Sequence, residues 1–372
     1  MVATDDTLMP RRSTDGTKEA GPALKLVFFS PFFFPRIGGL ETVVQVLATE
    51  WTRMGHAVTV ITDTPNPAPD SFSFKVLRRP GIIATVAAYR NADVVILANI
   101  SLWGLLPLLF CGFRCPPWIA THQIWYENPG SPVKPLDRLK KALAHCASAN
   151  ISCSHSVDTF LGLNGHVIPN PYDHQLFRRL PEVRRDRDLV FLGRLVSDKG
   201  CDLLLDALAL LRDQGQMLSL TIIGSGPELH ALNEQVRRLR LEAQVSFTGP
   251  RSGEELVRLL NQHRIMVVPS RWNEPFGIVA LEGIACGCII VGSDGGGLAE
   301  AIGPCGVTFP NGDVIALQGA LTALVNVSGE SLPSDSIAKH LAHHHSVTIA
   351  SLYNQVIVSV VPLPGQNCAR IN

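Results

Sequence analysis

Short apolar runs alternate with longer amphipathic stretches along most of this chain. Residues 24–30 form an apolar run rich in Val and Phe, and residues 40–54 carry apolar side chains at helical spacing up to Gly55. The runs have the length of buried strands, whereas the stretches between them have the length of helices. Further strands are expected at residues 57–62, 93–98, 118–121, 149–152 and 166–168, and in the second half at residues 189–192, 219–223, 244–248, 265–269 and 289–292.

This alternation predicts an α/β protein with two Rossmann-like, doubly wound domains. Strand, glycine loop, helix and strand make a βαβ unit, whose right-handed crossover implies a parallel sheet. Prolines and a charge-dense segment break the pattern near residues 169–188. We therefore expect a first domain at residues 24–170, a linker at 171–188 and a second domain at 189–345. Residues 1–23 are expected to be a disordered leader, and residues 362–372 form a tail with no readable signal.

The apolar stretch at residues 94–113 is nearly long enough to span a bilayer of about 30 Å. Asn99, Ser101, Gly104 and Pro107 interrupt it, and charged residues bracket it closely. A strand followed by a buried helix is therefore the better prediction for this stretch.

Composition narrows the class of protein further. Apolar residues make up 46% of the chain and charged residues only 17%, which suits parallel sheets covered by helices. The 32 basic residues balance the 32 acidic ones, so a nucleic-acid polymer is not expected as a partner. The nine cysteines lack zinc-site spacing and indicate thiols in a reducing compartment. With no signal peptide in the first twenty residues, a cytoplasmic location is expected.

Two glycine loops follow predicted strands. Gly38 and Gly39 come before the first helix, where missing side chains let the backbone approach a ligand and the helix N-terminus favours an anion. They do not form a GxGxxG fingerprint, which disfavours a nicotinamide cofactor. In the second half, Arg194 and Lys199 lie five residues apart after a strand. Two cations at the carboxyl end of a strand suit a diphosphate leaving group.

Glu274 and Glu282 frame the segment Glu-Pro-Phe-Gly-Ile-Val-Ala-Leu-Glu, which opens an apolar helix. Pro275 suits a helix start, and Gly277 lets backbone N–H groups approach phosphate oxygens. Fully helical spacing would separate the two carboxylates by about 12 Å. They are therefore expected to meet different parts of one ligand and not to share a proton or a metal ion.

At these residues the sequence resembles the retaining glycosyltransferases of family 4, which have the GT-B fold of two Rossmann-like domains facing a cleft. The resemblance covers most of residues 24–361. The motifs that carry it are Pro-Ser-x-x-x-Glu-Pro-Phe-Gly at residues 269–277 and Gly-Arg-Leu at 193–195, followed by Lys-Gly at 199–200. The others are Ile-Gly-Ser-Gly-Pro-Glu at 223–228, Phe-Thr-Gly at 247–249 and Asp-Gly-Gly-Gly-Leu-Ala-Glu at 294–300.

The resemblance implies a role for each matching residue. Arg194 and Lys199 would stabilise the donor diphosphate, Glu282 would hold the ribose, and Glu274 would contact the transferred sugar. His122, which follows a strand, would lie near the donor sugar as a fourth catalytic residue. The remaining donor-binding residues implied by the resemblance are Gly38, Gly39, Phe247, Thr248, Phe276, Gly277, Ile278 and Val279.

The resemblance also implies a chemistry and a topology. The anomeric configuration would be retained without a covalent nucleophile, and cations would replace a metal ion, so neither a metal nor another cofactor is expected. Asp186-Arg187-Asp188 has the letters of a metal motif but lies in the expected linker, where it is interpreted as solvated charge. A last helix at residues 346–361 would cross back to the first domain. Ser346 stands where the family often has an aromatic residue.

Donor and acceptor stay open. A UDP-sugar is the expected donor, with GDP-mannose next, and the acceptor can be a glycan, a lipid-linked molecule or a small molecule. Residues 134–141 could form a basic amphipathic patch on an anionic membrane, or an ordinary solvated helix face. The alternatives are a sugar-nucleotide epimerase of the same fold, or a scaffold that has lost catalysis. A phosphorylase lacks its cofactor-lysine context here.

Overall fold

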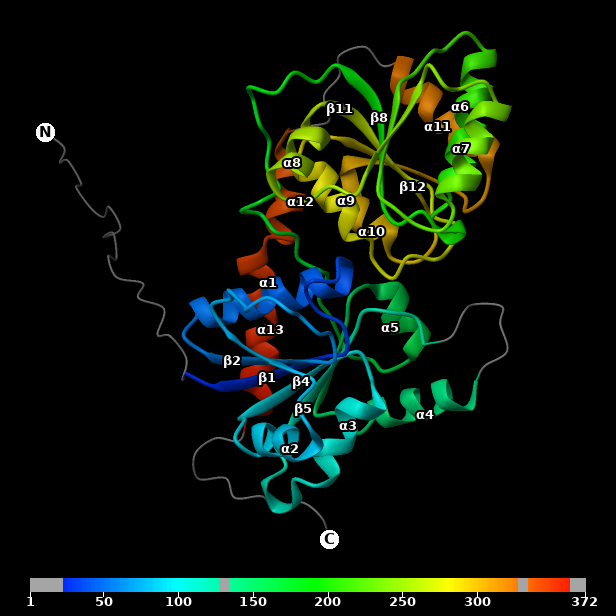
Figure 1. Ribbon diagram of the computed structural model, residues 1–372. Coiled ribbons are helices and arrows are strands. Elements are labelled where there is room, and N and C mark those ends of the chain that lie inside the picture. The colour runs from blue at the N-terminus through cyan, green and yellow to red at the C-terminus, as the bar shows by residue number, and fades with distance from the viewer. Residues whose placement is uncertain (1–22, 127–133, 327–333, 362–372) are drawn as a thin grey trace, which may run out of the picture.

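The computed structural model describes residues 23–126, 134–326 and 334–361, which form two α/β domains (Figure 1). Within these residues the first sheet has seven strands in the order β3-β2-β1-β4-β5-β6-β7, and the second has six in the order β10-β9-β8-β11-β12-β13. All neighbouring strands in both sheets are parallel. In each sheet the strand order reverses beside the domain's first strand, which is the doubly wound topology predicted from the sequence. The predicted fold class is confirmed.

The first-domain strands are β1 (Lys25–Ser30), β2 (Ala57–Thr62), β3 (Lys75–Arg78), β4 (Val94–Ala98), β5 (Trp118–His122), β6 (Ala149–Ser152) and β7 (His166–Val167). Those of the second domain are β8 (Arg187–Leu192), β9 (Leu220–Ile223), β10 (Val245–Gly249), β11 (His263–Val268), β12 (Ile289–Ser293) and β13 (Gly306–Phe309).

The α-helices are α1 (Gly39–Arg53), α2 (Ile82–Arg90), α3 (Leu102–Leu109), α4 (Pro135–Ala144), α5 (His155–Leu161), α6 (Cys201–Asp213), α7 (Leu229–Arg238), α8 (Gly253–Asn261), α9 (Ile278–Ala285), α10 (Leu298–Ile302), α11 (Val314–Asn326), α12 (Ser334–His343) and α13 (Ser346–Val360). The 3-10 turns of the described residues are η1 (Gly112–Arg114), η2 (Ser197–Lys199) and η3 (Gly303–Cys305).

The sequence did not predict β3 and β13, and it misplaced the start of β8. Both missed strands have four residues and lie at sheet edges, where a short apolar run gives little signal. The strand β8 begins at Arg187, inside the segment expected to be linker. Asp188 is not simply solvated charge, because its carboxylate accepts hydrogen bonds from both N–H and Oγ of Ser219, at 2.9 Å each.

The helices cover both faces of each sheet, as buried parallel strands require. In the first domain α1 and α13 lie on one face of the sheet, whereas α2 and α3 lie on the other (Figure 1). In the second domain α6, α7 and α11 pack on one face, and α8, α9 and α10 pack on the other.

The last helix, α13, crosses from the second domain back to the first and packs along α1. Trp51 of α1 donates its indole N–H to the carbonyl of Ala350 at 3.3 Å, and Ile349 and Tyr353 are buried. Ser346, at the start of the helix, donates to Glu50 Oε1 at 2.8 Å. A polar contact with α1 therefore holds Ser346, at the position where the resemblance stated above implies an aromatic residue.

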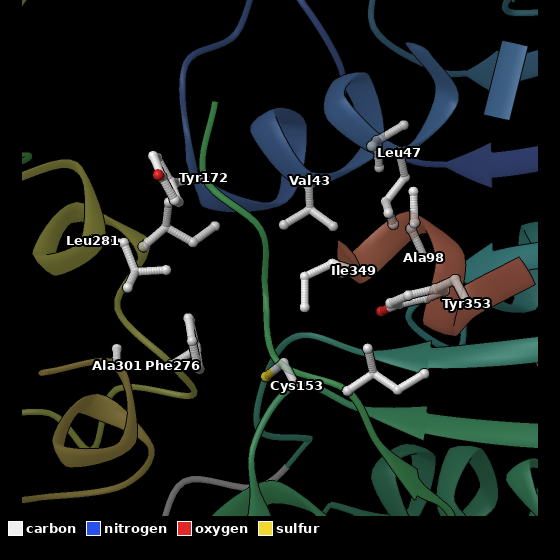
Figure 2. Close-up of a cluster of buried hydrophobic side chains, with 14 of the residues drawn as sticks. Val43, Leu47, Ala98, Cys153, Tyr172, Phe276, Leu281, Ala301, Ile349 and Tyr353 are labelled. Atoms are coloured by element: carbon white, nitrogen blue, oxygen red, sulfur yellow. The ribbon is translucent and has the colours of Figure 1, made fainter. Parts of the chain in front are cut away.

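The apolar core continues from the first domain into the second (Figure 2). Val43 and Ile349 lie on the first-domain side, Tyr172 lies between the domains, and Phe276 and Leu281 lie on the second-domain side. Because burying apolar side chains stabilises by about 25 cal/mol per Å², this shared cluster opposes separation of the domains.

Residues 94–113 form β4, α3 and the start of η1, and not a membrane span. Within the described residues no helix is both long and apolar enough to cross a bilayer. The expectation of a buried helix was wrong for the outer side of α3. Trp103 is 72% exposed and Leu109 is 79% exposed.

Candidate functional site

Three loops meet where the strands of the second sheet end. They follow β8, β11 and β12 and lead into η2, α9 and α10. The first two are tied together at their backbones, because the carbonyl of Asp198 accepts from the N–H of Arg271 at 2.9 Å. The predicted residues Arg194 and Glu274 lie in these loops, and Lys199 is the last residue of η2.

A glycine brings Lys199 against the loop that follows β11. Gly200 has a φ of +66°, and a side chain there would collide with the carbonyl oxygen of Pro269. Only glycine combines this left-handed conformation with so close an approach. The preceding residue, Lys199, is thereby held beside Ser270 and Glu274.

Glu274 is buried, and its carboxylate has two partners. Its Oε1 atom lies 2.5 Å from Lys199 Nζ and accepts a hydrogen bond from Ser270 Oγ at 2.6 Å. A buried carboxylate requires such compensation, because an unpaired charge in this position would be costly. The two residues predicted to serve the diphosphate and the sugar therefore form one charge pair.

The late glycine loop holds the backbone of Glu274 from the other side. Gly297 N–H donates to the carbonyl of Glu274 at 2.7 Å, and a side chain on Gly296, which has a φ of +77°, would strike that same carbonyl. Asn311 Oδ1 accepts from Gly295 N–H at 2.8 Å, which fixes the loop from outside. Glycine at residue 297 is also required by space, because a side chain would meet Ser154 and Pro275.

The N-terminus of α9 faces the first domain. Gly277, with a φ of +102°, turns the chain into the helix. Ala280 N–H donates to the carbonyl of Gly277 at 3.0 Å, whereas the N–H groups of Gly277, Ile278 and Val279 have no partner within the helix. A Cβ on Gly39 of the first domain would lie 3.6 Å from Ile278 Cδ1. The first glycine loop therefore lies against the helix end that best suits a phosphate.

The N-terminus of α1 is less suited to an anion than the sequence suggested. Glu41 lies in its first turn, folds back over Gly38 and pairs with Arg36 at 3.7 Å. Because that carboxylate already occupies the positive end of the helix, a diphosphate is favoured at α9 and not at α1. The geometry favours a spacing role for Gly38 and Gly39.

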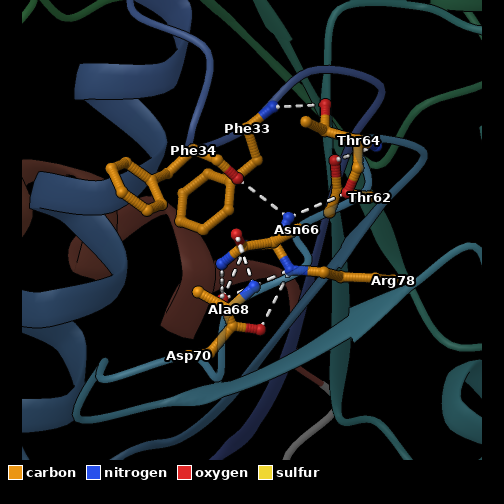
Figure 3. Close-up of polar contacts among 8 residues, drawn as sticks. All are labelled: Phe33, Phe34, Thr62, Thr64, Asn66, Ala68, Asp70 and Arg78. Atoms are coloured by element: carbon orange, nitrogen blue, oxygen red, sulfur yellow. Dashed lines mark hydrogen bonds and ion pairs between the residues drawn. The ribbon is translucent and has the colours of Figure 1, made fainter.

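Arg78 anchors the loop that carries these two glycines (Figure 3). Its Nη1 donates to the carbonyls of Phe34 and Thr64, each at 2.8 Å, and its Nη2 donates to Asp70 at 2.7 Å. The bond from Arg78 lowers the pKa of Asp70. Phe33 N–H also donates to Thr64 Oγ1 at 3.1 Å, so the loop approaches Gly38 on a fixed path.

Arg194 differs from Lys199 in being exposed, with no ion-pair partner in the described part of the chain. Phe247 and Thr248 lie at the end of β10. Phe247 is partly buried against the apolar core of the second domain, and Thr248 Oγ1 lies 3.1 Å from the carbonyl of Gly249. Contacts between these two residues and a base stay a prediction.

Glu282 lies on the second turn of α9, beyond Phe276 and Val279. Burial, with a smaller contribution from Asp173, raises the pKa of its carboxyl to about 8. Unlike Glu274 it has no hydrogen-bond or salt-bridge partner among the described side chains. A partly protonated carboxyl in this setting can both donate to and accept from a diol.

The geometry argues against the catalytic role expected for His122. The side chain is buried, with Nδ1 3.0 Å from the Tyr126 hydroxyl and Nε2 2.9 Å from Asn150 Oδ1. Burial lowers its pKa to about 4, so the ring is neutral at pH 7. With both nitrogens engaged inside the first domain, His122 is interpreted as a positioning residue.

Two family models match adjoining parts of the chain. Residues 37–176 match the model for glycosyltransferase family 4, and residues 174–334 match the model for glycosyl transferases group 1. The chain belongs to the family 4 glycosyltransferases. The resemblance inferred from the sequence motifs is thereby confirmed.

Curated relatives align with different fractions of this chain. A glycogen synthase of Mycobacterium tuberculosis is 37% identical over 141 residues, which are 37% of this chain and 34% of that protein. The alpha-monoglucosyldiacylglycerol synthase of Streptococcus pneumoniae is 22% identical over 313 residues, or 72% of this chain and 70% of that one. The alignment with the glycogen synthase thus spans about a third of its length.

Solved structures share the fold of this family member. Anabaena Alr3699/HepE in complex with UDP and glucose has a TM-score of 0.75 at 21% identity, covering 90% of this chain and 100% of that one. The sucrose-phosphate synthase of Thermosynechococcus elongatus has a TM-score of 0.73 at 20% identity, with coverages of 90% and 100%.

A cavity of about 490 Å³ lies on the second domain between η2 and α7. Asp202, Glu228 and Glu234 line it, with Arg238 as its basic residue. Three carboxylates would repel a diphosphate, so this cavity does not suit the donor. Within the described residues no three His, Cys, Asp or Glu side chains group as metal ligands, and metal independence stays a prediction.

The sequence missed several residues that build the site. Trp125 of the first domain donates its indole N–H to the carbonyl of Asn273 at 2.5 Å, and Ser154 Oγ donates to the carbonyl of Pro275 at 2.7 Å. Glu300 accepts from the backbone N–H of His155 at 3.1 Å. These contacts join the domains and carry no local motif, because both partners are far apart in the chain.

Proposed function

We propose that this chain is a retaining glycosyltransferase that moves a sugar from a nucleotide-sugar to an acceptor without a metal ion. A UDP-sugar is the favoured donor, and GDP-mannose is the next. The proposed acceptor is a glycan, a lipid-linked molecule or a small molecule. The names of the relatives support sugar transfer, and the solved structures of HepE with UDP and with UDP-glucose support a UDP-sugar.

The observation that carries the proposal is the pair of Lys199 and Glu274 beside the N-terminus of α9. The unpaired N–H groups of the helix, the ammonium of Lys199 and the exposed Arg194 guanidinium together offer positive charge for a diphosphate. Charge that accumulates on a departing diphosphate would be stabilised by such fixed donors.

The same pair bears on the stereochemistry. Glu274 Oε1 is already hydrogen-bonded by Lys199 and Ser270, which makes its carboxylate a poor nucleophile. We therefore propose attack by the acceptor hydroxyl from the side of the leaving group. The bond from the anomeric carbon to the diphosphate oxygen breaks, the bond to the acceptor oxygen forms, and the departing phosphate takes the hydroxyl proton.

The test is a donor screen with the full chain. UDP-glucose, other UDP-sugars, GDP-mannose and ADP-glucose are each incubated with cell-extracted lipids and glycans, with and without EDTA, and products are identified by mass spectrometry and NMR. A glycosylated product with the donor's anomeric configuration, formed equally in EDTA, is expected. Epimerised donor without acceptor would indicate an epimerase, and no binding of any sugar nucleotide at millimolar concentration would refute the proposal.

A further inference from the structure

The helix α3 has no polar side chain on any side. Its sequence is Leu-Trp-Gly-Leu-Leu-Pro-Leu-Leu. One side faces the sheet, where Gly104 touches the Phe29 ring so closely that a Cβ would lie 2.8 Å from its Cδ1, and Leu108 is buried. A surface helix normally carries charged or polar residues opposite its buried stripe, and an all-apolar helix is normally covered on every side.

The outer side of α3 is nevertheless uncovered by the described chain. Together with neighbouring residues it forms what we term the α2–α3 surface, and Tyr89 of α2 ties the two helices by donating to the Gly104 carbonyl at 3.0 Å. Phe113 is fully exposed and Ile83 is 84% exposed. The apolar members of this surface are Ile83, Leu102, Trp103, Leu109, Phe110 and Phe113.

The α2–α3 surface lies away from the second domain. In Figure 1 α2 and α3 cover the face of the first sheet that is opposite α1 and the second domain. A large partner on this face would therefore leave the loops around Glu274 unobstructed. Large exposed apolar patches usually mark an interaction site.

The charged residues around the α2–α3 surface indicate which kind of partner it binds. Residues 81–118 contain two cations, Arg90 and Arg114, and one acid, Asp93. Asp93 accepts from the backbone N–H of Lys25 at 2.7 Å, at the base of β4. Arg90 donates to the carbonyl of Phe110 at 2.7 Å, so its guanidinium lies directly beside the apolar residues, and Arg114 is exposed next to Phe113. The rim of the surface is therefore cationic.

A cationic rim around Trp, Phe and Leu side chains matches an anionic lipid surface, where aromatic rings sit at headgroup level and Arg pairs with lipid phosphate. A second copy of the chain would instead bring like charges together. At 1.5 Å per residue, the eight residues of α3 extend only about 12 Å, which suits a position in the plane of the interface. We propose that the α2–α3 surface docks this protein peripherally on an anionic bilayer.

The basic helix α4, which the sequence singled out for membrane contact, is the weaker candidate. Lys140 pairs with Asp137 at 3.5 Å, and Lys141 donates to the carbonyl of Phe160 at 3.0 Å. Two of its cations are thus engaged within the protein, as Arg90 of the α2–α3 surface also is. The two surfaces differ in exposed apolar area, since Leu136 and Leu139 of α4 are 45% and 47% exposed, whereas Trp103 and Leu109 are 72% and 79% exposed.

Vesicle flotation of the full chain tests the proposal independently of catalysis. Vesicles of phosphatidylcholine alone are compared with vesicles of equal parts phosphatidylcholine and phosphatidylglycerol. Binding is expected to the anionic vesicles. The double variant Trp103→Ser with Phe113→Ser should lower partitioning by at least about tenfold, because burying an aromatic ring contributes that much or more. Arg114→Ala should weaken binding to the anionic vesicles.

The matched control is the double variant Met217→Ser with Ile315→Ser. These two side chains are 63% and 62% exposed on the second domain, so exposed apolar surface is lost there as well, although less than at Trp103 and Phe113. Unchanged melting temperatures would show that both double variants fold. No binding to either vesicle, or equal loss in the control, would overturn the proposal. A wild-type dimer that the Trp103→Ser, Phe113→Ser variant dissolves in light scattering would overturn it as well.

Discussion

Lys199 Nζ lies 2.5 Å from Glu274 Oε1, so a cation assigned to the donor diphosphate is neutralised by the carboxylate assigned to the sugar. A bound diphosphate would compete with Glu274 for this ammonium. Binding of a diphosphate to Lys199 would therefore also change the electrostatic environment of Glu274, the residue assigned to the sugar.

Substitution of Lys199 and substitution of Glu274 should have opposite effects on the affinity for UDP. Lys199→Ala should weaken UDP binding and lower kcat on the order of 100-fold, since a charge-stabilising donor is lost. Glu274→Gln should lower kcat but tighten UDP binding by a few-fold, because Lys199 is then free for the diphosphate. Isothermal titration with UDP and initial rates measure both. Glu254→Gln, which breaks the exposed pair with Arg178, is the control, and weaker UDP binding in Glu274→Gln would contradict the competition.

Gly39→Leu should block the donor without affecting the fold. Gly39 is exposed, and a longer side chain would extend over Ile278 at the N-terminus of α9. We expect the donor KM to rise about tenfold or more, with the free energy of unfolding changed by no more than about 0.5 kcal/mol. Gly81→Leu, at an exposed glycine where a Cβ meets no atom within 4 Å, should leave KM unchanged. Equal KM values in both variants would refute the spacing role of Gly39.

His122→Gln should lower stability more than catalysis. At pH 7 the loss of two buried hydrogen bonds should cost about 1–3 kcal/mol of unfolding free energy, while kcat stays within a few-fold. The wild-type pKa of about 4 lies below the ordinary value of 6.5, so the unfolded chain binds a proton that the folded chain lacks. Stability should thus fall as pH drops from 6.5 to 4, and less steeply in His122→Gln. Urea unfolding checks the slopes, and a drop in kcat far beyond the stability loss would restore a catalytic role.

The raised pKa of Glu282 predicts that its contribution to stability changes with pH in the opposite direction to that of His122. Its folded pKa of about 8 lies above the ordinary value of 4.5, so the folded state keeps a proton that the unfolded chain has released. The contribution of this group to stability is therefore complete below pH 4.5 and is lost as pH rises toward 8. Glu282→Gln should melt at a higher temperature than wild type at pH 8.5 and at a similar one at pH 4.5. A gap between the two proteins that does not change with pH would contradict the raised pKa.

Much of the fold follows from local sequence because each buried strand and each helix carries its own periodic signal. The loops of the second domain were also predictable, since Lys199-Gly200 and Glu274 to Gly277 combine charge with glycines that the backbone geometry requires. Where two main-chain segments approach this closely only glycine fits, so the position of such an approach can be inferred from the sequence.

The first-domain half of the site was less predictable for a physical reason. His122 is the last residue of β5, at a strand end where a ligand-binding histidine would also lie, but its side chain is hydrogen-bonded to Tyr126 and Asn150 inside the first domain. Glu41 changes the meaning of Gly38 and Gly39 through a side-chain conformation that spacing alone does not specify. Contacts such as Trp125 with Asn273 join residues 148 positions apart, beyond the reach of any motif.

The return of α13 to the first domain means that the chain passes between the domains twice, near Tyr172 and again near His345. These two passages are themselves bridged, with Tyr172 N–H donating to the carbonyl of His344 at 3.3 Å. A single connection would let the domains twist and swing freely, whereas two connections joined at one point form a pivot. If the domains open to admit a donor, the bridge between Tyr172 and the segment at His344 and His345 would therefore be the axis of that rotation.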